Sequence, residues 1–449
     1  MKTKIEPFKI KTVEAIPMTT VAQREGYLKE AFYNLFTLRS DKVTIDLLTD
    51  SGTTAMSDRQ WGALMYADEA YAGSVSYYKF EDAVKKITGF KEVIPTHQGR
   101  AAERILFQAM GVEGKFIPNN THFDTTRGNI EFSHGFAFDL LNEKGKNPEI
   151  IDDFKGNMDI AKLEDFIKEK GAENIPVCFI TVTNNAGGGQ PVSMQNIRET
   201  KELCNKYNIP LFLDCCRFAE NCYFIKKREK GYENKSILEI AQEMFSYADG
   251  ATMSAKKDGM SNTGGFLATN NEKLARDART ILIVTEGFVT YGGLARRDLE
   301  ALAIGFEEVM DENYLSYRIG QVEYLGNQLI KNNVPILNPP GGHGIFLDAK
   351  RFLPNMPTSQ FPAQVIANEI YRLSGVRTVE IGSLMFGEST IMDLVRLAIP
   401  RRVYTQNHID YVVEACTEAY ENRNNLKGLK IVWEAPILRH FTAKLAPID

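Results

Sequence analysis

Residues 248–258 read Ala-Asp-Gly-Ala-Thr-Met-Ser-Ala-Lys-Lys-Asp, a strand-like run that ends in a pair of lysines. The small and apolar residues at 250–254 predict a buried strand, and the glycine-rich stretch 261–265 predicts a turn soon after it. A lysine amine just beyond a strand can form a Schiff base with an aldehyde, and Ser254 beside it can donate to an anion. Lysine pairs are also common on protein surfaces, so the chemical interpretation needs support from the rest of the chain.

The chain around this motif alternates strands and helices. Apolar runs predict strands at 92–96, 177–182, 209–214, 250–254 and 265–269. Helical spacing of apolar residues predicts helices at 101–110, 194–206 and 236–247. This order predicts an α/β fold with a mostly parallel sheet that is covered by helices.

The pattern changes near residue 311, which predicts a second domain. A long helical stretch reaches residue 331, and short strands are expected at 334–337 and 344–347 before further helices. We therefore expect a large domain at 57–310 and a small C-terminal α+β domain at 311–449, with the N-terminal segment 1–56 packed on the small domain.

Composition excludes several classes of protein. The chain has 449 residues, 43% of them hydrophobic and 25% charged, which is ordinary for a soluble globular protein. A formal net charge of −5 argues against a nucleic-acid partner, and no apolar run is long enough to span a membrane. The charged N-terminal sequence lacks the apolar core of a secretory signal, and the six scattered cysteines favour a reducing, cytoplasmic location. The six histidines show no zinc-binding spacing.

Polar residues follow four of the predicted strands. They are Gln98-Gly99-Arg100, Asn184-Asn185, the stretch 214–217 and the stretch 254–257. Ligands of open parallel α/β sheets bind at the carboxyl ends of the strands. Four strands would thus deliver polar groups to one edge, which a purely structural role does not require.

These residue types suit pyridoxal 5′-phosphate (PLP), which needs a lysine for its aldehyde and an acid for its ring nitrogen. Lys256 or Lys257 fits the first role, and Asp214 fits the second because a carboxylate stabilises the protonated ring. The phosphate also needs hydrogen-bond donors. The ring oxygen O3′ needs a polar partner, and the face of the ring needs an aromatic side chain that stacks on it. The candidates are Gln98, Gly99, Arg100 and Ser254 for the phosphate, Asn185 and Arg217 for O3′, and Phe123 or Tyr71 for the ring. Simple helix or turn capping is the alternative for Asp214 and for Gln98 to Arg100.

Seven motifs in order make a resemblance specific: TDSGT (49–53), DEAYAGS (68–74), THQGR (96–100), GQPVS (189–193), MSAKKD (253–258), YGGL (291–294) and FPAQ (361–364). The chain resembles the β-eliminating lyases over nearly its whole length, from residue 6 to residue 443. The resemblance implies a PLP-dependent transferase-like enzyme of fold type I that forms a homotetramer and is activated by potassium or another monovalent cation. The segment 1–56 would then also contact a neighbouring subunit.

The resemblance also assigns roles to residues. Lys257 would carry the cofactor, with Lys256 beside it, and take the Cα proton; Tyr71 would be a proton donor. The substrate site would comprise Thr49, Ser51, Arg396, Ile381, Phe36 and Tyr291, with Arg396 on the substrate carboxylate. The cation site would comprise Gly52, Glu69 and Asn262.

Three positions favour an indole rather than a phenol as leaving group. Ile381 stands where the phenol-releasing members have Arg, and an apolar wall suits indole. Asp124 and His440 likewise follow the indole-releasing pattern, in which they would manage a proton near the ring. Asp124 could instead cap a turn, and His440 could be a satisfied interface histidine. The expected reaction is elimination of L-tryptophan to indole, pyruvate and ammonia.

Some positions depart from the family pattern. Cys215-Cys216 replaces small or hydroxylated residues, Gly188 is an extra glycine, Arg296 replaces a glycine, and 382–393 is shorter than usual. A phenol-releasing or cysteine-type lyase is the first alternative. A non-catalytic scaffold is disfavoured because Lys257, Asp214 and Arg396 are all present. A dehydrogenase is disfavoured because no GxGxxG motif follows a first strand.

Overall fold

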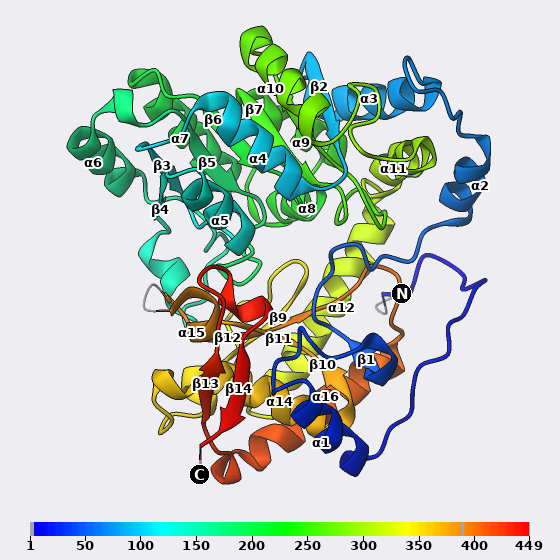
Figure 1. Cartoon of the computed structure of the whole chain (residues 1–449), viewed down its shortest axis with the longest axis vertical. Coiled ribbons are helices and arrows are strands. Elements are labelled where there is room, and N and C mark those ends of the chain that lie inside the picture. Colours follow the sequence, from blue (N-terminus) through cyan, green and yellow to red (C-terminus); the bar gives the residue numbers. More distant parts are fainter. Residues whose placement is uncertain (1–3, 388–389, 449) are drawn as a thin grey trace. The chain divides into compact units, whose positions relative to one another are not determined.

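The computed structural model describes residues 4–387 and 390–448. The chain divides into two compact units (Figure 1). The large unit comprises residues 51–145 and 152–316, and the small unit comprises 1–50, 146–151 and 317–449. The long helix α12 (Glu312–Lys331) begins in the large unit and ends in the small one. No helix in the described ranges is long and apolar enough to cross a membrane.

A five-stranded sheet forms the centre of the large unit. Its order is β2 (Glu92–Thr96), β8 (Gly265–Thr269), β7 (Gly250–Ser254), β6 (Leu211–Asp214) and β5 (Cys178–Thr181). Strands β5, β6 and β7 are parallel, while β8 runs antiparallel to both β7 and β2. Four strands therefore point the same way, which confirms the mostly parallel sheet and puts their carboxyl ends at one edge.

Helices cover this sheet because its strands are apolar on both faces. Helix α4 (Gly99–Met110) packs on β7 and β8, and Phe107, Phe179 and Phe212 belong to one buried cluster between helix and sheet. The other helices are α2 (Asp58–Tyr66), α3 (Val75–Thr88), α5 (Asp124–Phe132), α6 (Ile160–Lys170), α7 (Met194–Lys206), α8 (Phe218–Arg228), α9 (Ile237–Ser246), α10 (Glu272–Thr285) and α11 (Arg296–Glu308). A parallel pair, β3 (Phe116–Asn119) and β4 (Phe136–Asp139), lies beside α5.

The small unit is built on a three-stranded antiparallel sheet of order β11 (Val379–Ile381), β12 (Leu394–Ala398), β9 (Gly344–Asp348). Two further pairs are β1 (Ile45–Asp46) with β10 (Val376–Arg377), and β13 (Leu429–Trp433) with β14 (Lys444–Pro447). Its helices are α1 (Val21–Glu30), α13 (Ala349–Phe352), α14 (Pro362–Ser374), α15 (Ser383–Phe386) and α16 (Gln406–Glu421). The strand predicted at 334–337 is wrong, because only Ile336 forms an isolated bridge, to Leu347.

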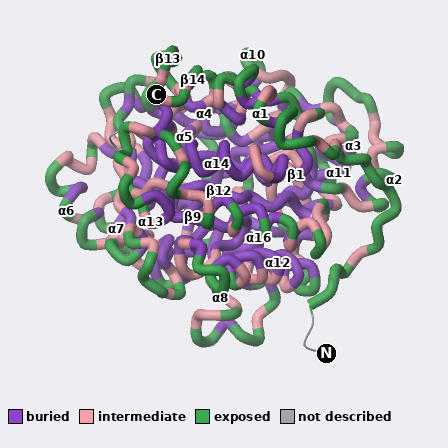
Figure 2. The backbone as a smooth tube through the Cα atoms, turned by 90° about the horizontal axis from the view of Figure 1, so that it is seen from below, coloured by how far each residue is buried: buried purple, intermediate pink, exposed green. Residues whose placement is uncertain are grey.

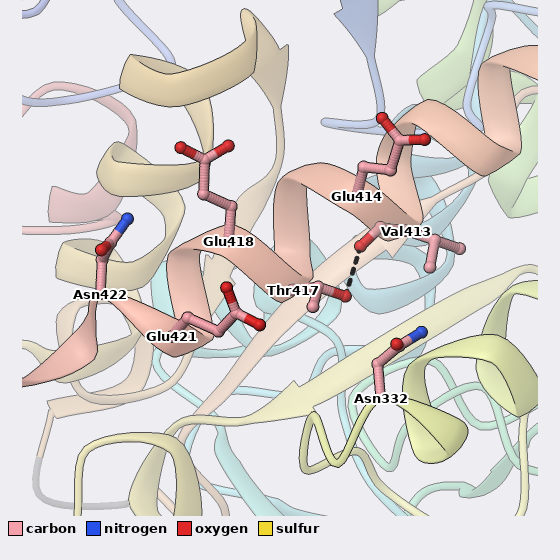
Figure 3. Close-up of a pocket in the computed structure, with 7 residues that line it drawn as sticks. All are labelled: Asn332, Val413, Glu414, Thr417, Glu418, Glu421 and Asn422. Carbon is pink, nitrogen blue, oxygen red and sulfur yellow. Dashed lines mark hydrogen bonds between the residues drawn. The ribbon is translucent and has the colours of Figure 1, made fainter.

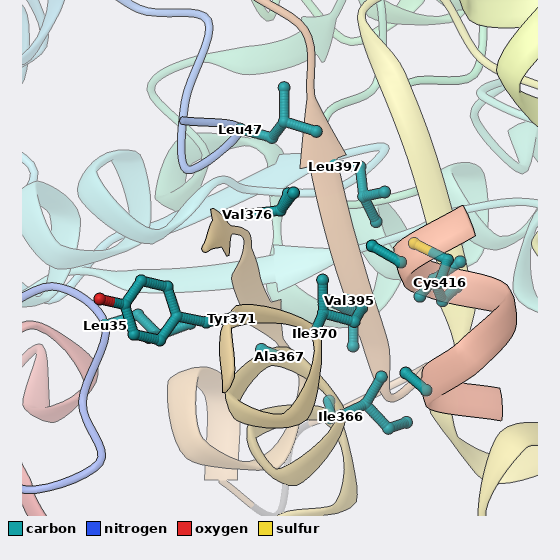
Figure 4. Close-up of a cluster of buried hydrophobic side chains, with 14 of the residues drawn as sticks. Leu35, Leu47, Ile366, Ala367, Ile370, Tyr371, Val376, Val395, Leu397 and Cys416 are labelled. Carbon is teal, nitrogen blue, oxygen red and sulfur yellow. The ribbon is translucent and has the colours of Figure 1, made fainter. Parts of the chain in front are cut away.

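The core of the small unit lies between its sheet and α14. Ile366 and Ile370 of α14 share a buried cluster with Val395 and Leu397 of β12 and with Cys416 of α16 (Figure 4). Helix α14 is coloured as buried along most of its length (Figure 2). The strands and α14 thus form a packed platform that carries the polar residues of β11 and β12.

A buried ion cluster joins the end of the N-terminal segment to this platform. Asp50 is fully buried, and its Oδ2 accepts from Arg401 Nη1 at 2.9 Å and lies 3.7 Å from Arg318 Nη2. Arg318 and Arg401 are themselves buried, so Asp50 compensates two cations away from water.

Removing the charge of Asp50 is therefore expected to destabilise the fold. Asp50→Asn should lower the free energy of unfolding by about 3–5 kcal/mol, because it leaves buried guanidinium groups uncompensated. Urea denaturation measures this change. The control is Asp41→Asn, which removes an exposed pair with Arg39 and should change little. Equal denaturation midpoints for the two variants would contradict the prediction.

Candidate active site

The first feature of the candidate site is a close main-chain contact at the edge of the sheet. A Cβ on Gly99 would lie 2.6 Å from Ser254 Cβ and 2.8 Å from the Ser254 backbone nitrogen. Only glycine therefore lets the start of α4 approach the end of β7 this closely. The contact joins two of the four predicted strand-end stretches.

The start of α4 is suited to an anion. Gln98 occupies the N-cap position without a side-chain hydrogen bond to the helix, and Arg100 is exposed in the first turn. Backbone N–H groups and the helix dipole favour a negative group at such an end, and Arg100 adds charge. The structure thus brings Gln98, Gly99 and Arg100 close to Ser254, at a helix end where a phosphate could be held.

Three cations lie close together beside this proposed phosphate cradle. Burial lowers the pKa of Lys256, and the charges of Lys257 and Arg100 lower it further. An anion bound here would relieve this repulsion, so the residues present fit the phosphate of PLP.

The two lysines make different contacts. Gly52 N donates to Lys256 O at 2.7 Å, and a Cβ on Gly52 would lie 2.7 Å from Lys256 Cε, so Lys256 packs on the 49–53 motif. The Nζ of Lys257 instead lies 3.8 Å from Cys216 Sγ, which also accepts from Ser254 N at 3.2 Å. The unusual Cys216 therefore contacts the predicted Schiff-base lysine directly.

Two carboxyl groups, those of Asp214 and Glu103, lie near Lys257. Asp214 ends β6, is buried and accepts from Cys216 N at 3.3 Å. Glu103, one turn along α4 from Gly99, accepts from Thr126 Oγ1 at 2.6 Å. Burial and the nearby charge of Asp214 raise the pKa of Glu103 to about 7. Sequence analysis missed Glu103. The only signal in the sequence was its position, one helical turn after the glycine that begins α4.

The remaining predicted cofactor residues lie at element ends in the same unit. Phe123 occupies the N-cap position of α5, and Arg217 that of α8; Arg217 and Asn185 are buried. Asp124 is also buried, and its Oδ1 accepts from Thr125 N at 2.6 Å. The turn-capping role considered for Asp124 is thus present, and a second role is compatible with it.

Tyr71 and Tyr291 are brought together on the surface of the large unit. Tyr71 is 66% exposed; its ring centroid lies 5.5 Å from that of Phe288 and 5.5 Å from that of Tyr291. Arg296, the residue that departs from the family pattern, donates to Ala70 O at 2.7 Å and lies 4.3 Å from the Tyr291 ring centroid. A hydrogen bond with Tyr291 raises the pKa of Tyr71, and Arg296 opposes this rise.

The small unit carries the other predicted residues. Arg396 lies on the central strand β12 and donates to Leu48 O at 3.0 Å, next to Thr49. Ile381 ends β11 and is buried. Phe36 and His440 pack edge to face at 5.7 Å. The structure therefore brings Arg396 to the 48–49 backbone, and His440 to Phe36.

The predicted cation residues are only partly gathered. Asn262 Nδ2 donates to Gly52 O at 3.0 Å, while the exposed Glu69 pairs with Arg297 at 3.4 Å. Ser51, the first residue of the large unit, lies next to Gly52 in the chain. Within residues 4–387 and 390–448 no group of three or more His, Cys, Asp or Glu residues has a metal-binding arrangement.

A surface pocket on the small unit has different chemistry. It is lined by Glu414, Glu418 and Glu421 of α16 together with neutral residues, and Thr417 Oγ1 donates to Val413 O at 2.8 Å (Figure 3). Among the residues that the structure describes, no lysine or arginine lines it, so it does not suit a phosphate or a carboxylate.

Comparison with known proteins places the chain in a class. The sequence profile of the β-eliminating lyases matches residues 46–415. Two solved structures share the fold, at 12–14% identity: serine palmitoyltransferase of Sphingomonas wittichii (TM-score 0.61; 90% of this chain, 97% of that chain) and the SepCysS–SepCysE N-terminal domain complex (TM-score 0.56; 85% and 95%). The fold is PLP fold type I, as predicted.

Individual relatives are similar over their full length. A tryptophanase of Salinibacter ruber is 55% identical, covering 100% of this chain and 96% of its own. A tryptophanase of Hyphomonas neptunium is 53% identical and a tyrosine phenol-lyase of Symbiobacterium thermophilum 49% identical, each covering 99% of both chains. The chain belongs to the β-eliminating lyase family and is a PLP-dependent lyase.

The Gly99 contact predicts a cofactor-binding defect. Gly99→Ala should weaken PLP binding roughly 10- to 100-fold, because overpacking at this contact costs about 1–3 kcal/mol. Titration of the apoprotein with PLP, followed by fluorescence, measures the affinity. The control is Gly62→Ala, where an added Cβ meets nothing within 4 Å. Equal affinity in both variants would refute the proposed phosphate cradle.

Proposed function

We propose that this lyase acts on L-tryptophan and releases indole, pyruvate and ammonia. The apolar Ile381 at the end of β11 carries the proposal, because an apolar side chain beside the leaving group suits an indole and supplies no charge to a phenolate. The names of the relatives at 53–55% identity support the same substrate. The alternative is a phenol-releasing or carbon–sulfur lyase, given tyrosine phenol-lyases at 49% identity.

The residues of the large unit would hold PLP. Gly99, Arg100 and Ser254 would bind its phosphate, Phe123 its ring face, and Asn185 and Arg217 its ring oxygen. Asp214 would keep the ring nitrogen protonated. When bound, the cofactor supplies an electron-accepting ring next to the substrate Cα.

The chain's own residues would then move the protons. Arg396 would bind the substrate carboxylate with help from Thr49 and Ser51, since a guanidinium matches a carboxylate in shape and charge. Lys257 Nζ would accept the proton from Cα. Tyr71 would donate to the indole ring carbon that leaves; its raised pKa keeps the phenol protonated at neutral pH. Asp124 and His440 would position or relay a proton near that ring.

We also propose a homotetramer that is activated by potassium and works in the cytoplasm. Helix α2 supports self-association, because Trp61, Met65 and Tyr66 are exposed by 57%, 84% and 84%. Exposed apolar residues gathered on one helix are typical of a subunit interface. In the assembly, Gly52, Asn262 and Glu69 would supply oxygen ligands suited to a hard monovalent cation.

The activity test measures products from several substrates. PLP-loaded protein is given L-tryptophan, L-tyrosine or S-methyl-L-cysteine, with and without potassium, and pyruvate and indole are measured. We expect potassium-dependent pyruvate and indole from tryptophan, and little product from tyrosine. Pyruvate from tyrosine in preference to tryptophan would refute the indole proposal.

The role of Lys257 is tested by paired substitutions. Lys257→Ala should remove covalent attachment of PLP after borohydride reduction and abolish turnover. Lys256→Ala should keep the covalent attachment and lose only part of the affinity for PLP, because Lys256 adds positive charge near the phosphate. Mass spectrometry of the reduced protein locates the attachment. Attachment that persists in Lys257→Ala would assign the role to another lysine.

The leaving-group preference is tested at Ile381. Ile381→Arg should lower kcat/KM for tryptophan by roughly 100-fold, since a buried guanidinium beside an indole lacks a partner. Ile381→Val is the matched control, and it should lower kcat/KM for tryptophan by less than about tenfold. Steady-state rates of indole release by the two variants measure this difference. Equal effects of the two substitutions would mean that Ile381 does not contact the leaving group.

A further inference from the structure

Two carboxyl groups face each other beside Ile381 in the small unit. Glu380 precedes Ile381 in β11, and Asp393 lies just before β12. A Cβ on Gly382 would overlap Asp393 Oδ1 and would lie 2.9 Å from Glu380 Oε1. The two side chains thus converge on the same glycine, and Glu380 is only 3% exposed.

This pair retains a proton near neutral pH. Burial and the charge of Asp393 raise the pKa of Glu380 to about 8, and burial raises the pKa of Asp393 to about 6. Arg439 is the cation that faces Glu380, while Asp348, which pairs with Arg351 at 2.6 Å, adds negative charge near Asp393. At pH 7 Glu380 is therefore mainly neutral and Asp393 mainly ionised.

Glu380 also holds the short helix α15. Its Oε1 accepts from Leu384 N at 2.8 Å, and its Oε2 accepts from Met385 N at 3.1 Å. Asp393 Oδ1 accepts from Ser383 N at 3.4 Å. The carboxyl groups thereby fix the helix that directly follows Ile381.

The same helix is held from the C-terminal segment. Arg439 Nε donates to Leu384 O at 2.8 Å, and its Nη2 donates to Ser383 O at 2.9 Å. Its neighbour His440 is buried against Phe36. Glu380, which precedes Ile381 in the chain, therefore binds backbone N–H groups of α15. Arg439, which precedes His440, binds backbone carbonyl groups of the same helix.

We propose that Glu380 and Arg439 are positioning residues that clamp α15, hold Ile381 and His440 in a fixed arrangement, and so set the preference for an indole leaving group. This inference rests on the proposed function, in which Ile381 and His440 lie near that leaving group. Neither clamp residue needs to touch the substrate.

The clamp has a defined pH dependence. Because the pKa of Glu380 is raised from 4.5 to about 8 on folding, the stability it contributes is complete below pH 4.5 and is lost as the pH rises through about 8. Above that pH the ionised Glu380 still accepts from Leu384 N and Met385 N, but its repulsion of Asp393 displaces it and α15 with it.

The first test compares two substrates on either side of the Glu380 pKa of about 8. Tryptophan has a bulky leaving group, whereas S-methyl-L-cysteine has a small one that does not reach the clamped wall. In the wild-type enzyme KM for tryptophan should rise roughly tenfold at alkaline pH while KM for S-methyl-L-cysteine changes little. In Glu380→Gln, which cannot ionise and keeps one acceptor oxygen for the α15 backbone, the alkaline rise should disappear.

The second test removes the other side of the clamp. Arg439→Ala should raise KM for tryptophan roughly tenfold with little effect on S-methyl-L-cysteine, because two hydrogen bonds to α15 are lost. The matched control is Glu434→Gln, which removes the partly exposed partner of Arg439 and leaves both main-chain bonds in place. It should leave the ratio of the two KM values unchanged.

A third measurement does not depend on activity. The melting temperature of wild-type protein should fall more steeply than that of Glu380→Gln as the pH rises from 4.5 towards 8, and the two curves should run parallel above pH 8. Parallel melting curves below pH 8, an alkaline rise in KM that persists in Glu380→Gln, or equal losses on both substrates in Arg439→Ala would each overturn the clamp. Pyruvate from neither substrate would overturn the proposed function, and with it the role of the clamp in leaving-group preference.

Discussion

The large unit depends on the contact between the main chains of Gly99 and Ser254. This contact puts the positive end of α4 against the end of β7, where a Cβ at position 99 would lie 2.6 Å from Ser254 Cβ. The residues of the proposed anion cradle, the lysine pair and Asp214 lie near one another because β2, β6 and β7 also end at the same edge. The chemistry at this edge therefore needs no flexible loop to assemble it.

Buried charge is handled in three different ways in this molecule. Asp50 pairs with two buried guanidinium groups, those of Arg401 and Arg318. Glu103 lies near a second carboxylate, and its pKa rises to about 7. Glu380 faces Asp393, and its pKa rises to about 8. The first case makes a rigid joint, while the other two leave protons that can be lost near physiological pH beside candidate functional residues.

The sequence predicted the central sheet well, because buried parallel strands are continuous apolar runs and their polar ends mark one edge. The predicted strand at 334–337 failed, since an apolar run alone does not show whether a partner is available, and Ile336 finds only a single bridge. Glu103, Glu380 and Arg439 were missed for a related reason. Their residue types are common on surfaces, and only the fold shows that Glu103 and Glu380 are buried and that Arg439 binds a main chain.

The residues proposed to set specificity are held in place by residues from other segments. Ile381 and His440 come from segments far apart in sequence, and α15 links them through Glu380 on one side and Arg439 on the other. Tyr71 has a similar support, because Arg296 binds the backbone beside it and packs on Tyr291. A change of substrate within this fold can thus arise from a supporting residue as readily as from one that contacts the leaving group, since a small displacement in a packed site alters which group fits.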